Sequence, residues 1–143
     1  MQGGTPNPAD VRSLAITVDD VVSAVEARRN GRPVVLRVTP PFHARMRARI
    51  HLAAGEGEER DDPDAVHLDP TRLLAPSAPD YPTPAETEDR LRASDEEYTR
   101  EVHHDHHREA VEAWREAVRD HLVADLTFET PDGPHTVRVK PLG

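Results

Sequence analysis

Two histidines in this sequence have the spacing of metal ligands. His103 and His107 occur four positions apart in "VHHDHHRE", and on a helix this spacing brings two imidazoles to one face, within reach of a single metal ion. A zinc or iron site usually needs a third protein ligand, and no HExxH or distant carboxylate–histidine motif supplies one. A helical wheel also places both histidines beside the apolar stripe of Trp114. We therefore predict structural histidines that hydrogen-bond to backbone or carboxylate groups, and we keep a metal-dependent enzyme as an alternative.

A second pattern places cations along one side of a predicted strand. The stretch "FHARMRARIHL", residues 42–52, alternates apolar and polar residues with the two-residue period of a β-strand. If Met46 and Ala48 face a core, the arginines that alternate with them, Arg45, Arg47 and Arg49, lie on the opposite face. Two further predicted strands add cations by the same alternation. The predicted partner-binding face consists of Arg37, Arg45, Arg47, Arg49, Arg138 and Lys140.

Three interpretations of this basic face are left open by the sequence. In the favoured one, the arginines form ion pairs with Glu129, with an acidic loop at 55–65, or with an acidic helix of another subunit. In the second, the face binds a protein partner. In the third it binds nucleic acid, because guanidinium groups suit phosphate. The third is disfavoured because the chain is acidic and no aromatic side chain is interleaved among the arginines for base stacking.

Other catalytic motifs are missing from the sequence. There is no cysteine, which excludes thiolate catalysis, thiolate metal sites and disulfides. No serine lies in a nucleophile-elbow pattern, and the seven glycines form no phosphate-binding loop. We therefore predict a protein that is not an enzyme and that needs no cofactor.

The composition is that of an acidic, arginine-rich chain. Its 143 residues carry 27 acidic and 18 basic side chains, and Lys140 is the single lysine. This bias is typical of halophilic archaea, although a high-GC bacterium also favours alanine and arginine. No apolar run is long enough to cross a membrane, and the first residues lack the apolar core of a signal peptide. These features predict a soluble, cytoplasmic protein that does not bind membranes.

Local signals place the elements that would carry these residues. "TVDDVVSAVEARRNG" predicts a helix that begins after Thr17, and "RPVVLRVT" predicts a strand that pairs with residues 42–52. Asp69 is predicted to cap one helical turn that begins at Pro70, and "TPAETEDRLRA" predicts a helix with a capping box of Thr83 and Glu86. A long helix is predicted from about residue 96 to 124, followed by a hairpin of "DLTFET" and "HTVRVKPL". The order helix, strand, strand thus occurs twice.

These elements predict an α+β fold. We expect one antiparallel sheet of about four strands with the helices on one face, built from the repeated helix-hairpin unit. Residues 1–12 are predicted to be a disordered tail. Residues 13–143 form a single predicted domain, with an acidic and proline-rich insertion at about 55–83.

Three segments resemble a known family. "RPVVLRVTPPF", "EYTREVHHDHHREAVEAWREAVRDHL" and "GPHTVRVKPLG" are similar to a family of short uncharacterised proteins from halophilic archaea, and the similarity extends from about Ser13 to the C-terminus. The resemblance implies a halophilic origin and assigns no activity and no residue role. The sequence as a whole predicts a small protein that acts through protein–protein contacts, with an unknown partner or with itself.

Overall fold

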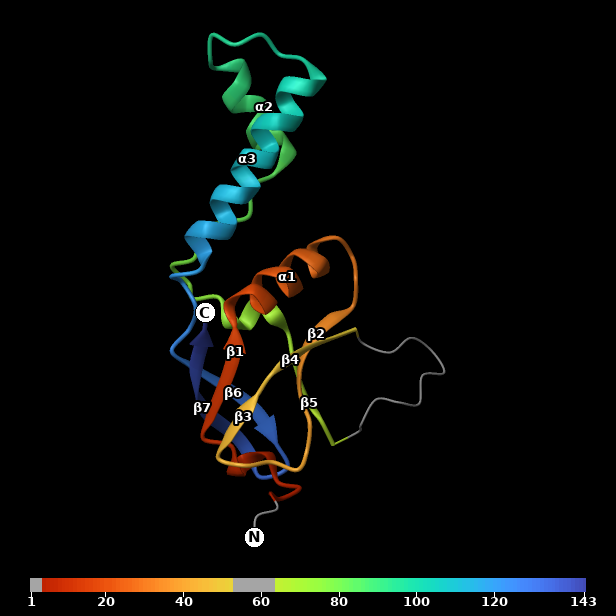
Figure 1. Cartoon of the computed structure of the whole chain (residues 1–143), viewed down its shortest axis with the longest axis vertical. Helices are drawn as coiled ribbons and strands as arrows, with labels where there is room; N and C mark the ends of the chain where they lie inside the picture. Colours follow the sequence, from red (N-terminus) through yellow and green to blue (C-terminus); the bar gives the residue numbers. More distant parts are fainter. Residues whose placement is uncertain (1–3, 53–63) are drawn as a thin grey trace. The chain divides into compact units, whose positions relative to one another are not determined.

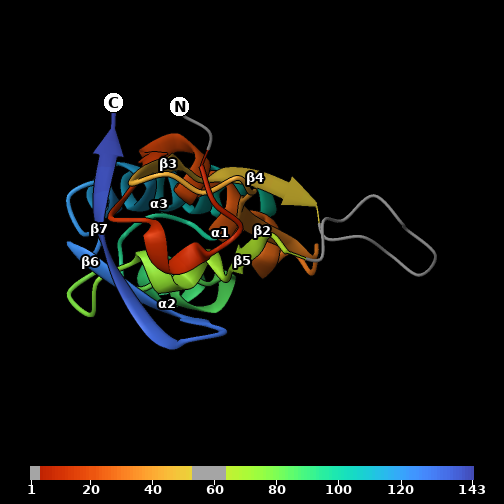
Figure 2. The same ribbon diagram turned by 90° about the horizontal axis from the view of Figure 1, so that it is seen from below.

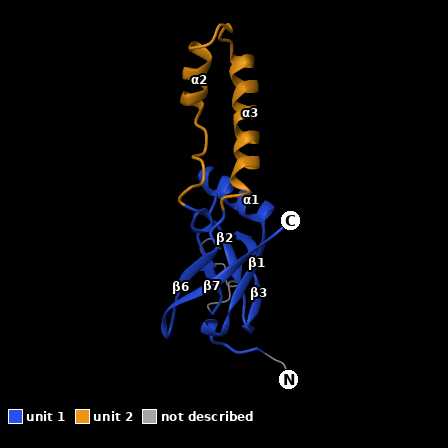
Figure 3. Ribbon diagram, turned by 90° about the vertical axis from the view of Figure 1, so that its left-hand side faces the viewer, with its two compact units in different colours: residues 1–75, 122–143 blue, residues 76–121 orange. Residues whose placement is uncertain are grey.

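The chain forms two compact units in a computed structural model that describes residues 4–52 and 64–143. Unit 1 comprises Met1–Ala75 and Leu122–Gly143, and unit 2 comprises Pro76–His121 (Figure 3). Most of the predicted acidic loop, at 55–63, lies outside the described residues. The arrangement as a tail and one domain with an insertion at 55–83 stays a prediction.

A four-stranded sheet forms one part of unit 1. Its strands lie in the order β3 (Arg45–Arg47), β1 (Ser13–Thr17), β7 (Gly133–Leu142) and β6 (Asp125–Thr130). β1 lies at the centre and pairs in parallel with both neighbours, whereas β6 and β7 form an antiparallel hairpin (Figure 1). One face is buried, because alternate side chains such as Leu14, Val139 and Leu126 belong to the core.

A three-stranded antiparallel sheet forms the other part of unit 1. β2 (Val34–Val38) lies between β4 (Arg49–Leu52) and β5 (Val66–Leu68). Helix α1 (Val18–Arg29) contacts β2 and β4 and buries an apolar stripe that includes Val21 and Val25. Its N-terminus is capped as predicted, since the Thr17 hydroxyl accepts a hydrogen bond from the Asp20 amide at 3.2 Å.

The prediction of a single antiparallel sheet is wrong. Unit 1 has two sheets, and the four-stranded one is mixed. The cause lies in the stretch 42–52, which is divided between the sheets at Ala48: β3 pairs with β1, and β4 pairs with β2. Figure 2 shows β3 and β4 as successive parts of one gold ribbon. Ala48 itself is fully buried, and its amide donates to the Ala15 carbonyl at 2.9 Å.

The predicted core side of residues 42–52 is also only partly correct. Phe42 and Ala48 are buried, but Ile50 and Leu52 remain 40% and 55% exposed. A uniform alternation in sequence produced two different environments, because the two short strands pack in different sheets. The proposed repetition of the helix-hairpin unit stays a prediction.

The N-terminal segment contacts the body of unit 1 from Thr5 onward. Thr5 and Phe42 exchange two backbone hydrogen bonds, of 2.9 and 2.7 Å. A short 3-10 helix, η1 (Pro8–Asp10), follows, and Val11 is fully buried. A second one, η2 (Pro70–Leu73), is capped by Asp69, as the sequence predicted.

Unit 2 is a pair of helices that contact each other, α2 (Pro84–Arg92) and α3 (Arg100–Val118). The predicted capping box of α2 is present, because the Glu86 amide donates to the Thr83 hydroxyl while the Glu86 carboxylate accepts from the Thr83 amide. These hydrogen bonds hold the pKa of Glu86 below its ordinary value. α3 is shorter than predicted, since Thr99 caps it. It belongs to unit 2, and α1 belongs to unit 1.

None of the described helices combines the length and apolar character that a membrane span requires.

Candidate anion-binding groove

Four of the six predicted cations lie together on the four-stranded sheet. Arg45 and Arg47 belong to β3, while Arg138 and Lys140 belong to β7. All four side chains are exposed. They lie on the face opposite the buried Leu14 and Val139, as the alternation along each strand requires.

The register of the strands arranges these cations in two rows across β1. Ser13 lies between Arg45 and Arg138, and Ala15 lies between Arg47 and Lys140. Neighbouring strands lie about 4.8 Å apart, so the cations of each row are separated by roughly 10 Å at their Cα atoms. Each row therefore has a basic residue on both sides of a small one.

The small residues of β1 leave a hollow between the cations. Its volume is about 620 Å³. We call this hollow the basic groove; it is lined by Arg12, Ser13, Ala15, Arg45, Met46, Arg138 and Lys140. Ser13 and Ala15 are half-buried and form its floor. Their short side chains cannot fill the space between two rows of long basic side chains, so the groove stays open.

One part of the favoured sequence interpretation, a pairing of Glu129 with these arginines, does not fit the geometry, whereas pairing with the acidic loop or with another subunit stays a prediction. Glu129 lies opposite Pro134 on β6 and lines a different hollow. Ion pairs between arginine and carboxylate join Arg28 to Asp69, Arg92 to Glu88 and Arg108 to Asp105. None of them involves a cation of the basic groove. Asp125, which is opposite Arg138 in the sheet register, is the nearest acidic residue in that row.

The other two predicted cations, Arg37 and Arg49, lie on the three-stranded sheet. They are opposite each other on β2 and β4. Arg37 also contacts His51, with 3.4 Å between Nη1 and Nε2, and His51 stacks on His67 with ring centroids 5.8 Å apart. The predicted basic face is therefore divided between two sheets.

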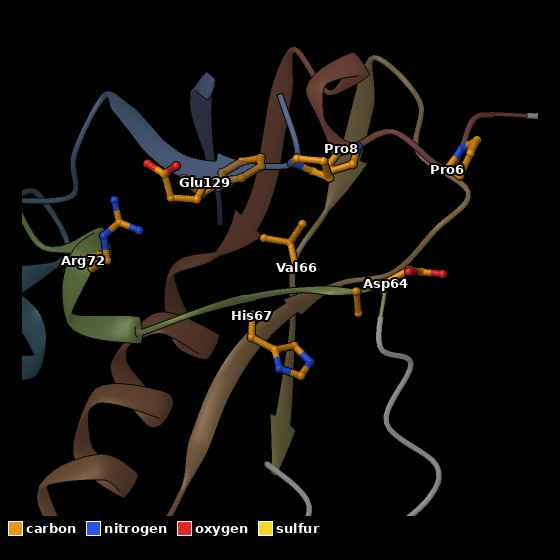
Figure 4. Close-up of a pocket in the computed structure, with 10 residues that line it drawn as sticks. Pro6, Pro8, Asp64, Val66, His67, Arg72 and Glu129 are labelled. Carbon is orange, nitrogen blue, oxygen red and sulfur yellow. The ribbon is translucent and has the colours of Figure 1, made fainter. Parts of the chain in front are cut away.

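A second hollow of unit 1 mixes charges of both signs. It has a volume of about 380 Å³, and its walls include Pro8, Val66, Arg72 and Glu129 (Figure 4). The Arg72 guanidinium donates to the Thr127 carbonyl. In the close-up, Val66 and His67 point to opposite sides of β5, as successive residues of a strand do. Because Arg72 lies in the same lining as two carboxylates, this hollow does not select one sign of charge.

The family of the chain is settled by comparison with protein-family models. A model described as a domain of unknown function, DUF8009, matches residues 1–143. The chain belongs to this family. No curated protein and no solved structure matches it. The predicted resemblance to an uncharacterised family is therefore confirmed, and the DUF8009 family assigns no residue a role.

In this DUF8009 chain, both candidate metal ligands have hydrogen-bond partners in unit 2. His103 Nε2 lies 2.9 Å from the Pro84 carbonyl oxygen, and His107 Nδ1 lies 2.8 Å from the Thr87 hydroxyl. Their rings stack in parallel, with centroids 6.1 Å apart. Among the residues with described positions, no group of three histidine, aspartate or glutamate side chains could share a metal ion. The contacts fit a structural role that joins α3 to α2.

The position of His107 predicts an effect of pH on unit 2. Burial lowers its pKa, and the positive charges of His103, His104 and Arg90 lower it further. The unfolded chain therefore binds a proton at this histidine more readily than the folded chain. We expect the thermal midpoint, followed by Trp114 fluorescence, to fall as the pH decreases below about 6.5, the ordinary histidine value.

The variant H107Q tests this expectation, since glutamine can bond to Thr87 and does not titrate. Its midpoint should depend less on pH below 6.5 than that of the parent chain. The exposed His104 supplies a matched control, and H104Q should keep most of the dependence. Equal pH curves for H107Q and the parent would contradict the role of His107.

The sequence analysis missed four residues that line the basic groove: Arg12, Ser13, Ala15 and Met46, the last of which it placed on the core side. Ser13 and Ala15 form its floor, and Arg12 lies in its lining. The buried Leu14 and Ile16 alternate with Ser13 and Ala15, so a two-residue period was present. It extends over only five residues that directly precede a helix, which is too short to predict a central strand.

Proposed function

We propose that this protein is a non-catalytic docking protein that binds an acidic protein partner in the basic groove. The observation that carries the proposal is that Arg45, Arg138 and Lys140 line the groove around the small residues of β1, with Arg47 next to Ala15 in the register. A protein surface that collects cations around an open floor attracts carboxylates and fixes their position by charge-assisted hydrogen bonds.

Nucleic acid is the second candidate, and the lining of the groove argues against it. No aromatic side chain is present among the lining residues, so bases would have no surface on which to stack. The remainder of the chain also repels a long polyanion, because its formal net charge is −9. A short acidic segment avoids most of this repulsion. A metal-dependent enzyme at His103 is less favoured, since that imidazole already contacts Pro84.

The composition supports the further proposal that the protein works in the cytoplasm of a halophilic archaeon. In molar salt the screening length decreases to about 3 Å. Attraction over longer distances is then lost, and only carboxylates in direct contact with the guanidinium groups still contribute. A groove with cations on both sides allows such contacts to a single ligand from two sides.

The first test measures binding of a fluorescein-labelled oligoglutamate by anisotropy. We expect the parent chain to bind, and we expect R45E/R138E to bind at least about tenfold more weakly, because two contacts become repulsive. R32E/R49E is a matched control. It changes the net charge equally at exposed positions outside the groove lining, and it should bind within about threefold of the parent.

Three outcomes would contradict the proposed function. An equal loss of affinity in both double variants would show that binding depends only on net charge. If the parent chain does not bind oligoglutamate at low ionic strength, the proposal of an acidic protein partner is wrong. If oligodeoxythymidine binds more tightly than oligoglutamate and R45E/R138E abolishes that binding, nucleic acid replaces the acidic protein. Circular dichroism of each variant verifies the fold, and R45Q/R138Q provides a milder change of the same two side chains.

A further inference from the structure

The basic groove has two parallel walls, and their spacing restricts the shape of its ligand. One wall is β3, where Arg45 lines the groove and Arg47 follows it opposite Ala15, and the other wall is Arg138 and Lys140 on β7. Both strands are parallel to β1 (Figure 1). Within each wall the two cations are two residues apart, which is about 6.6 Å along a strand.

An extended peptide has the same repeat. Its side chains alternate between two sides, and neighbours on one side are also about 6.6 Å apart. A peptide that lies along β1 would therefore direct successive carboxylates to opposite walls. An α-helix lacks this alternation, because its side chains turn by about 100° per residue and those on one face recur at i and i+4 rather than at i and i+2.

We infer that the ligand of the basic groove is an extended segment with about four consecutive acidic residues, whose carboxylates alternate between the β3 wall and the β7 wall. This inference rests on the proposed function. Each of the four carboxylates would meet one of the four cations, and the Ser13 hydroxyl on the floor can donate to the peptide. A run of like charges also repels itself and is already extended before it binds, which lowers the cost of ordering.

The spacing of the acidic residues, and not only their number, should decide affinity. The probes are labelled glycine–serine peptides with equal numbers of glutamates, either consecutive or at every second position. In the second peptide all carboxylates point to one side, so only one wall is used. We expect the consecutive peptide to bind at least about tenfold more tightly. A helix-forming glutamate–alanine peptide should bind as weakly as the one-sided peptide.

Substitution of the two cations of one wall should abolish the preference for consecutive glutamates over glutamates at every second position. In R138E/K140E the β3 wall remains, and we expect both extended peptides to bind weakly and within about twofold of each other. R138Q/K140Q repeats the test without new negative charge. Circular dichroism shows whether both variants are folded.

The outcomes separate this inference from the proposed function. If the two peptides bind with equal affinity while R45E/R138E still weakens the binding of oligoglutamate, the inference of an extended ligand is wrong and the proposed function stands. Tighter binding of the helical peptide would overturn the inference in the same way. If none of the peptides binds and oligoglutamate does not bind either, the proposed function itself is wrong.

Discussion

A48E is expected to unfold unit 1. Ala48 is fully buried at the point where the chain passes from β3 to β4, and its amide donates to Ala15 at 2.9 Å. A glutamate at this position must bury a carboxylate and also displace closely packed neighbours. The combined cost is about 3 kcal/mol or more, which is a large part of the 5–15 kcal/mol by which domains are usually stable. Urea denaturation followed by far-ultraviolet circular dichroism measures this loss.

R47E is the matched control for A48E. Arg47 is the adjacent residue, and its side chain is exposed. The same new carboxylate should lower the free energy of unfolding by less than about 1 kcal/mol. If R47E unfolds the chain as completely as A48E, Arg47 is part of a buried ion network and the basic groove is not open. If A48E keeps the stability of the parent, the burial of Ala48 is wrong.

The second large effect is expected for W114A in unit 2. Trp114 is only 4% exposed, its Nε1 donates to the Pro79 carbonyl at 2.9 Å, and its ring meets Tyr81 edge-on with centroids 4.7 Å apart. Removal of a buried tryptophan side chain costs about 3–5 kcal/mol. We expect the helical signal at 222 nm to be lost at a much lower urea concentration than in the parent chain.

W114F separates packing from hydrogen bonding at the same position. Phenylalanine keeps most of the apolar volume but leaves the Pro79 carbonyl without the indole donor, so we expect a loss of about 1 kcal/mol. A midpoint for W114A within the error of the parent would mean that Trp114 does not stabilise unit 2. Hydrogen exchange of β1 and β7 in W114A tests the predicted single domain, because their protection falls only if the two units unfold together.

The location of the acidic residues explains how an acidic chain can carry a basic groove. In unit 2, acidic residues outnumber basic ones, and many of them lie on the exposed side of α3. The exposed acidic residues of this helix are Glu101, Asp105, Glu109, Glu112 and Glu116. The segment 56–62, outside the described residues, is also mostly acidic. The net charge of −9 is therefore the sum of regions with different signs of charge, and it does not describe the face of the four-stranded sheet.

The sequence by itself determined the features that depend on neighbouring residues. Thr17 and Thr83 marked helix starts because a capping hydroxyl acts on an amide three positions away. The alternation at Arg45 and Arg47, and again at Arg138 and Lys140, placed these cations on the exposed face of their strands. Both kinds of signal are local, so a single sequence contains them.

Only the tertiary structure decided which strands became neighbours. β1 lies between β3 and β7 through pairings that join Ser13 to Arg45 and to Arg138. No pattern within five residues specifies partners so far away in the sequence, because backbone hydrogen bonds between strands are the same for any sequence. Long-range pairing also assigns Arg47 and Arg49 to different sheets, with the buried Ala48 between them in the chain. The alternation of residues 42–52 does not contain this information, because it is the same for both arginines.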